Sequence, residues 1–161
     1  MSAWPEPVER VADHLRQVAV ESRVEEFPAG TLTAEDAARA VGCDLSQIVK
    51  SLVFICDGKP VLVMVGGDRR ADRAKIEAAV PCEKAKIAGP DEVRSATGFE
   101  PGAVAPFPLP QIQTILVDHE LLVHEVVWTG AGSHQHVLAI APADLVRVTR
   151  ARSVDAIAED T

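Results

Sequence analysis

Four histidines late in the chain are the residues whose types most directly suggest chemistry. They are His119, His124, His134 and His136. Side chains two residues apart on a strand point to the same side, so positions 134 and 136 could bind one metal ion. No cysteine or carboxylate stands at a spacing typical of metal ligands, so we expect no metal. Ser133 beside His134 is a weak nucleophile pair, because sequence neighbours rarely hold the geometry of a catalytic triad.

Three other stretches are unusual in composition. In the first, Lys50 is a lone cation where a short helical turn is expected to enter an apolar strand. The second, residues 97–107, combines glycines at 98 and 102 with prolines at 101 and 106. The third is Gly130-Ala131-Gly132-Ser133. Taken singly, they are more typical of a solvated lysine, a rigid surface loop and a tight turn than of a functional site.

Several signatures of well-known enzyme classes are absent from the sequence. It has no GxSxG elbow, no phosphate-binding loop, no GxGxxG after a strand and no HExxH. Cys43, Cys56 and Cys82 are odd in number and have no CxxC spacing, which favours free thiols in a reducing compartment. We therefore expect a cytoplasmic protein without a disulfide framework.

The charge balance restricts the class of partner. The formal net charge is −8 at pH 7, which disfavours binding of DNA or other nucleic acid by bulk electrostatics. Basic residues gather only locally, at 69–75 and at 84–86. No apolar run is long enough to cross a membrane, so no membrane partner is expected.

The elements that must position these residues alternate irregularly along the chain. Periodicity and boundary signals predict helices over 5–21, 34–41, 70–80, 90–97 and 142–145, a short helical turn over 45–50, and strands over 24–27, 51–56, 60–65, 112–117, 123–128 and 136–141. Residues 57–59 predict a hairpin, 98–110 a fixed loop and 130–133 a turn. This order predicts an α+β fold with a mixed, mainly antiparallel sheet flanked by helices. We expect one domain over 1–161, with a frayed tail after about residue 152.

In this order and spacing, the motifs resemble those of the YbaK/ProX family of aminoacyl-tRNA editing domains. The matching segments are Thr33–Ala38, Val49–Val53, Gly98–Gly102 and Gly130–Ser133. Family members are free-standing or inserted in prolyl-tRNA synthetases, and they remove wrong amino acids, chiefly Ala or Cys, from tRNA. The resemblance implies a strongly curved sheet and hydrolysis of the ester bond of a mischarged tRNA.

The resemblance also implies roles for single residues. Lys50 would hold a phosphate or the terminal ribose, and Gly98 and Gly102 would let the backbone approach the ester, so these three are the expected catalytic residues. The expected substrate-binding residues are Ser51, Phe99, Glu100, Pro101, Asp118, Gly130, Ala131, Gly132 and Ser133. Attack by water, assisted by the ribose hydroxyl next to the ester, is the implied mechanism. It requires neither a cofactor nor a metal.

The implied partner is the acceptor end of a mischarged tRNA, handed over by an aminoacyl-tRNA synthetase or an elongation factor. Two alternatives stay open. One is a non-catalytic module of the same fold that binds tRNA or a synthetase. The other is a metal-dependent hydrolase built on the four histidines. The identity of the edited amino acid and tRNA is also open.

Overall fold

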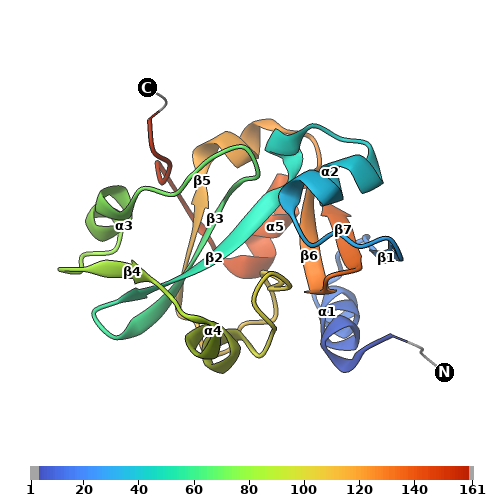
Figure 1. The fold of residues 1–161 in the computed structure, drawn as a ribbon, viewed down its shortest axis with the longest axis horizontal. Helices are drawn as coiled ribbons and strands as arrows, with labels where there is room; N and C mark the ends of the chain where they lie inside the picture. The colour runs from blue at the N-terminus through green and yellow to red at the C-terminus, as the bar shows by residue number, and fades with distance from the viewer. Residues whose placement is uncertain (1–3, 160–161) are drawn as a thin grey trace.

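The computed structural model describes residues 4–159, which form two sheets with helices around them (Figure 1). In chain order the elements are α1 (Glu6–Gln17), β1 (Val24–Glu26), α2 (Ala34–Val41), the 3₁₀ turn η1 (Leu45–Gln47), β2 (Val49–Cys56), β3 (Lys59–Gly66), α3 (Arg73–Ala79), β4 (Ala85–Ile87), α4 (Pro90–Thr97), β5 (Thr114–Asp118), the 3₁₀ turn η2 (His119–Val123), β6 (Val127–Ser133), β7 (His136–Ile140), α5 (Pro142–Thr149) and β8 (Arg152–Val154). Within the described range, no helix is both long and apolar enough to span a bilayer.

The larger sheet has the strand order β4-β2-β3-β5-β8. Its centre is the antiparallel hairpin of β2 and β3, which β4 extends antiparallel on one side, while β5 and β8 continue in parallel on the other. Asp57 and Gly58 form the two-residue turn of this hairpin with φ angles of 48° and 85°. Positive φ at both positions matches the twist of the strands, which confirms the predicted hairpin.

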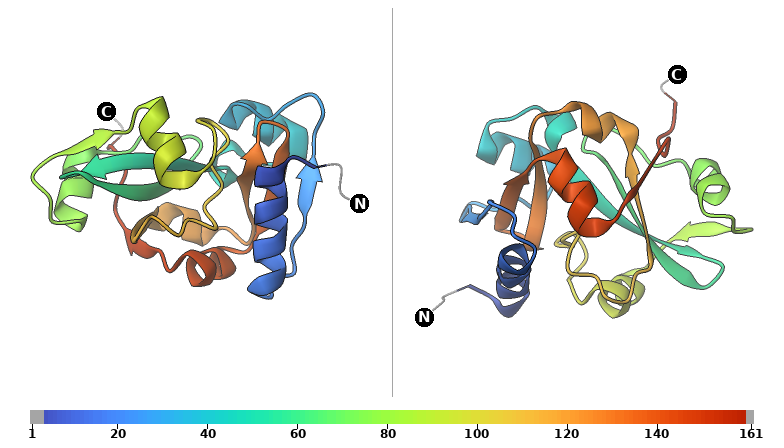
Figure 2. Two further views of the ribbon diagram at one scale, coloured as in Figure 1. Left: turned by 90° about the horizontal axis from the view of Figure 1, so that it is seen from below. Right: turned by 180° about the vertical axis from the view of Figure 1, so that it is seen from behind.

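The smaller sheet has the strand order β1-β7-β6 and is antiparallel throughout. A single parallel bridge between Ile48 and Trp128 connects it to the entrance of β2. Figure 2 shows α1 standing along this sheet, and its view from behind shows α5 in front, between the two sheets. The α+β class and the mainly antiparallel pairing are confirmed, although the strands form two sheets where one was predicted.

The main core lies between the two sheets and is built from aliphatic side chains with few aromatic rings. Val8, Val11 and Leu15 recur at helical spacing, and this apolar stripe of α1 is buried. The aromatic rings of Phe99 and Phe107, from the loop after α4, are buried in the same core. This loop therefore belongs to the interior of the molecule and is held by its own side chains.

Helix boundaries follow from local hydrogen bonding, as the sequence predicts. The hydroxyl of Thr33 accepts from the amide of Asp36 and so caps the start of α2. Gly42 and Gly98 end α2 and α4 in the left-handed conformation, each with a φ of 74°. These caps fix the segments that lead into β2 and into the loop after α4.

The predicted turn at 130–133 is wrong, because these residues belong to β6 and the chain turns at His134-Gln135. The glycines serve close packing instead. A Cβ on Gly132 would lie 2.9 Å from the carbonyl of Pro7, and one on Gly130 would lie 3.3 Å from that of Val104.

The C-terminal end differs from the prediction in three places. Residues 119–123 form η2, so the strand predicted from 123 begins only at Val127. The tail predicted to fray after about residue 152 makes tertiary contacts: Arg152–Val154 pairs in parallel with β5, and Ala156 and Ile157 are buried. The last helix also continues to Thr149. A three-residue edge strand carries too little periodicity to be recognised from sequence.

Candidate active site

A pocket of about 240 Å³ lies where α2, the entrance of β2, the loop after α4 and β6 meet. It is lined by Thr31, Leu32, Thr33, Ala34, Ala37, Ile48, Val49, Lys50, Ser51, Leu52, Gly102, Val104, Trp128, Thr129, Gly130, Ser133 and Val137. Since one water molecule occupies about 30 Å³ in the liquid, the pocket has room for a small organic group. Most of its wall is apolar or small, with one cation and several hydroxyls.

Lys50 is the cation of this pocket. It lies within β2, opposite Val65 of β3, and its Nζ donates a hydrogen bond to the carbonyl of Arg69. Burial lowers the pKa of the Lys50 ammonium from its ordinary value, while the carboxylates of Glu35 and Asp68 act in the opposite direction. Lys50 is therefore a half-buried, partly desolvated charge and not the solvated lysine of the alternative interpretation.

Ser51 presents an unusual hydroxyl beside this cation. Its Oγ is buried and has no hydrogen-bond partner in the structure. A buried hydroxyl without a partner costs about 1–3 kcal/mol. Ser51 is among the residues that line the pocket, but its Oγ is inaccessible, so a bound molecule could supply the missing hydrogen bond only if the side chain turned toward it.

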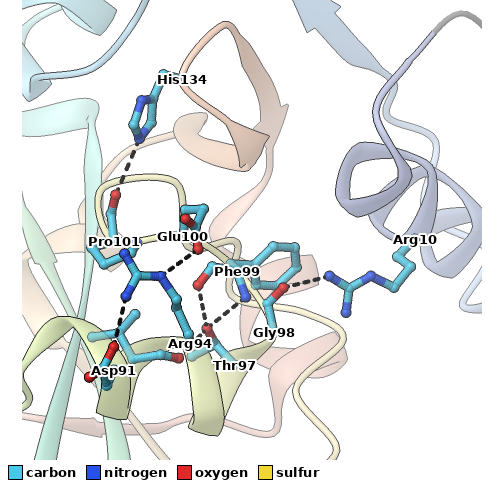
Figure 3. A network of polar contacts seen from close by, with 10 residues as sticks. Arg10, Asp91, Arg94, Thr97, Gly98, Phe99, Glu100, Pro101 and His134 are labelled. Carbon is cyan, nitrogen blue, oxygen red and sulfur yellow. Dashed lines mark hydrogen bonds and ion pairs between the residues drawn. The ribbon is translucent and has the colours of Figure 1, made fainter.

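The loop after α4 is tied down at its start by a network of hydrogen bonds (Figure 3). The buried hydroxyl of Thr97 donates to the carbonyl of Val93 at 2.7 Å and accepts from the amide of Phe99 at 3.0 Å. One residue further on, Glu100 pairs with Arg94 of α4 at 2.8 Å. The loop conformation is thus fixed before any ligand binds.

Contacts from two other elements hold the same loop (Figure 3). Arg10 of α1 donates to the carbonyl of Gly98 at 2.7 Å, and its guanidinium lies 4.8 Å from the ring centroid of Phe99. His134 contacts the carbonyl of Pro101 at 3.2 Å. Gly102 follows with a φ of 81° and reaches the pocket, so its backbone is presented to a ligand in a fixed orientation.

Comparison with known proteins gives this pocket a context. The family model of the aminoacyl-tRNA editing domain matches residues 29–148, which include every residue that lines the pocket. The chain belongs to the aminoacyl-tRNA editing domain family. The resemblance drawn from the sequence motifs is thereby confirmed.

Relatives of this editing domain occur both as short chains and within larger enzymes. The uncharacterized protein YwhH of Bacillus subtilis is 34% identical over 136 residues, which cover 84% of this chain and 86% of that protein. The proline–tRNA ligase of Desulfitobacterium hafniense is 34% identical over 118 residues, which cover 71% of this chain but 20% of the ligase. A solved structure described as "a putative trans-editing enzyme for prolyl tRNA synthetase" superimposes with a TM-score of 0.92 at 33% identity, covering 98% of this chain and 100% of that one.

The editing domain brings five of the predicted site residues together and leaves the others elsewhere. Lys50, Ser51, Gly102, Gly130 and Ser133 all line the pocket. Of the others, Gly98 caps α4, Phe99 and Ala131 are buried in the core, Glu100 is exposed beside Arg94, Pro101 contacts His134, and Gly132 packs against Pro7. Each of the three motif segments contributes at least one residue to this pocket, but the motif spacing could not tell which residue of each segment faces it.

Asp118 lies outside the pocket and has a structural task. Its two carboxylate oxygens accept from the amides of Glu120, at 3.0 Å, and Ala156, at 2.9 Å. The carboxylate therefore caps η2 and ties the C-terminal segment to β5. Its complete burial is explained by these two hydrogen bonds.

The four histidines do not assemble into a metal-ligand set in the described part of the chain. The group whose ligand atoms lie within 4.8 Å of one another is Asp118, His119 and Glu120. Asp118 is already satisfied by two amides, and Glu120 pairs with Arg69 at 3.1 Å. We therefore argue no metal centre from this cluster.

The thiols also lie apart from the pocket. Cys43, Cys56 and Cys82 are free. Burial, followed by the neighbouring thiol of Cys82, raises the pKa of Cys56 to about 12, so this thiol stays protonated near neutral pH. A thiolate nucleophile at Cys56 is not supported.

Sequence reasoning assigned no site role to the wall of the pocket that α2 supplies. Thr33 and Ala37 of this wall carry no chemical signal, and only tertiary packing brings them opposite Lys50. The partner of Ser133 was missed as well: its Oγ hydrogen-bonds Nδ1 of His136, not the adjacent His134. Antiparallel pairing of β6 with β7 sets that partnership, so strand register is the signal that could have found it.

Proposed function

We propose that this editing domain hydrolyses the ester bond between a small amino acid and tRNA, as a free-standing deacylase. The observation that carries the proposal is one pocket that combines a half-buried cation, an unpartnered hydroxyl and a glycine on a tied-down loop. These are Lys50, Ser51 and Gly102. A pocket of this kind suits a small ester that carries a phosphate and a ribose at one end.

The physical need for such a site is one of selectivity. A synthetase pocket discriminates by only about 1–3 kcal/mol against an amino acid that lacks a methylene, so a second site must destroy the error. Ala34, Ala37 and Gly130 leave space for a small side chain on the pocket wall. Alanine and cysteine are the amino acids that we propose as substrates.

In the proposed mechanism, positioning of the substrate and water supplies most of the rate enhancement. The Lys50 ammonium binds a phosphate or the terminal ribose as a point charge. The backbone at Gly102 approaches the ester carbonyl, and its fixed orientation stabilises the charge that develops on the carbonyl oxygen. The ribose hydroxyl next to the ester orients the attacking water, so the reactants are held together before the bond breaks.

The partner that we propose is the acceptor end of a mischarged tRNA. The net charge of −8 leaves little general attraction for tRNA, so delivery by a synthetase or an elongation factor would supply the selectivity. The similar segment within a proline–tRNA ligase supports a prolyl system as the source of the error.

A panel of mischarged tRNAs tests the proposal directly. Single-turnover assays would compare tRNAs charged with alanine, cysteine and the cognate amino acid, and we expect release of a small amino acid but not of the cognate one. Tight binding of a mischarged tRNA without hydrolysis by the folded protein would favour the non-catalytic binding module instead.

A further inference from the structure

Three side chains from the three strands of the smaller sheet form a chain of contacts that ends at the pocket. The Oγ of Ser133 hydrogen-bonds Nδ1 of His136. On the other side of the imidazole, Nε2 lies 3.2 Å from Oε2 of Glu26. This second contact is a close approach of the two groups and does not count as a hydrogen bond.

Strand register produces this arrangement. Glu26 of β1 pairs with His136 of β7, and His136 pairs with Ser133 of β6. The pairing of β6 with β7 is irregular between Gly130 and Ser133, which is the kind of bulge that redirects a side chain. Ser133 therefore both lines the pocket and contacts the imidazole.

Among the described residues, three side chains contact the imidazole, and the ionisable one is Glu26. His136 is a buried residue, with 2% of its side chain exposed. From the segment before α1, the ring of Trp4 packs edge-on at 5.5 Å; from β1 comes the Glu26 carboxylate, and from β6 the Ser133 hydroxyl. In the tautomer that carries its proton on Nε2, Nδ1 is free to accept from the Ser133 hydroxyl.

The hydrogen bonds of the Ser133 hydroxyl orient it for proton transfer. The Oγ of Ser133 accepts from the amide of Gln135 at 3.0 Å and donates to Nδ1, so its orientation is fixed from two sides. A hydroxyl, an imidazole and a carboxylate in contact order are the parts that activate a nucleophile in many hydrolases. If the contact between Ser133 and His136 served only to hold β6 and β7 together, Ser133 would not need to line the pocket.

We propose that Ser133 is a catalytic residue of the deacylation and that His136 and Glu26 are positioning residues that act through it. This inference rests on the proposed function. The water oxygen bonds to the ester carbonyl carbon while its proton passes to Oγ of Ser133 and the hydroxyl proton of Ser133 passes to Nδ1 of His136. When the bond between the carbonyl carbon and the ribose oxygen breaks, the proton returns by the same path to the ribose oxygen. The Glu26 carboxylate, in contact with Nε2, stabilises the transient imidazolium.

Single-turnover deacylation of a mischarged tRNA that the wild-type protein cleaves tests the relay. Ser133→Ala and His136→Gln should each slow the bond-breaking step by on the order of a hundredfold, with the protein concentration for half-maximal rate unchanged. The double variant should be no slower than the slower single variant, because residues that act as a unit are not additive.

Matched variants separate catalysis from folding. Glu25 lies exposed on the same strand as Glu26 and Ser95 lies exposed on α4, so Glu25→Gln and Ser95→Ala should leave the rate unchanged. Ser133→Thr keeps a hydroxyl and should restore a large part of the rate even if His136→Gln fails to fold. Circular dichroism would check the fold of each variant.

The outcomes that overturn the relay are distinct. If folded Ser133→Ala cleaves as fast as wild type while Lys50→Ala does not, the relay is refuted and the proposed function stands. An aminoacyl group trapped covalently on Ser133 would refute the proton relay in favour of a nucleophile. If the wild-type protein cleaves none of the mischarged tRNAs, the proposed function fails and the relay with it.

Discussion

At the scale of single residues, the pocket of this editing domain places a cation and a hydroxyl where neither is fully satisfied by the protein. The Lys50 ammonium gives one hydrogen bond to a carbonyl although it has three protons to donate. The neighbouring Ser51 hydroxyl has no partner. Lys50 therefore keeps hydrogen-bonding capacity that a substrate could use, whereas the inaccessible Ser51 hydroxyl could pair with a substrate only after its side chain turns. Each residue leads to a testable prediction.

Replacing Lys50 by alanine should slow deacylation by on the order of a hundredfold, because a charge-assisted hydrogen bond of about 3 kcal/mol would be lost in the transition state. Lys50→Arg should not restore the rate fully, since a planar fork differs from a compact ammonium. The measurement is single-turnover deacylation with the fold checked by circular dichroism. Lys59, exposed at the start of β3, provides the control, and Lys59→Ala should behave as wild type. A folded Lys50→Ala that cleaves at the wild-type rate would place Lys50 outside the active site.

Ser51→Ala should affect stability and activity in opposite ways. Removing a buried hydroxyl that has no partner should leave the free energy of unfolding unchanged or raise it by up to about 1 kcal/mol. Hydrolysis should slow by roughly tenfold if the hydroxyl pairs with the substrate, because that hydrogen bond is lost. Urea denaturation and single-turnover deacylation would measure the two effects. A drop in stability with unchanged activity would mean that the hydroxyl serves the fold.

At the scale of elements, the glycines of β6 connect the pocket to α1. Gly132 has a φ of 102°, and a Cβ there would lie 2.9 Å from the backbone of Pro7. Gly58, in the hairpin turn, has a φ of 85°, but a Cβ there would have no neighbouring atom within 4 Å. The two positions share the same kind of backbone strain and differ in packing.

Gly132→Ala should therefore destabilise the domain by several kcal/mol, whereas Gly58→Ala should cost only about 1–2 kcal/mol for the left-handed conformation. The difference between the two variants isolates the packing of β6 against α1. Urea denaturation of both proteins would measure it. Equal losses of stability would show that α1 can move away from β6 at little cost.

The sequence predicted those elements that carry local signals. The caps at Thr33, Gly42 and Gly98 and the Asp57-Gly58 turn depend on one or two residues, so they were recognised correctly. The glycines at 130 and 132 mimic a turn, and only the proximity of Val104 and Pro7 explains why they belong to a strand. Long-range packing of this kind leaves no periodic trace in the sequence.

The same limit applied to the candidate site. Lys50 was recognisable as a lone cation in an apolar stretch, and its neighbour Ser51 followed from the same motif. Glu26 and His136 are 110 positions apart, and only the pairing of β1 with β7 brings them into contact. A motif read along the chain cannot reveal such a pair, because the pair exists only through strand register.

At the scale of the whole molecule, the negative net charge limits how strongly the domain binds a polyanion such as tRNA. With a net charge of −8, few cations are available to release counterions from tRNA, and Lys50 is the one that lines the pocket. We expect the isolated domain to bind tRNA weakly. Its log Kd should change by only about 0.7–1.4 for each tenfold change in salt, the dependence of one or two phosphate contacts to a single strand.

Fluorescence anisotropy of labelled tRNA over a range of salt concentrations would measure this slope. Lys50→Ala should reduce the slope by about 0.7 if the ammonium contacts a phosphate, while Lys59→Ala should leave it unchanged. A slope that corresponds to six or more phosphate contacts would show that a basic surface binds tRNA. Delivery of the tRNA by a synthetase or an elongation factor would then not be required. A shallow slope together with efficient hydrolysis at high enzyme concentration would mean that recognition is confined to the acceptor end. Selectivity among tRNAs would then have to come from the protein that hands the substrate over.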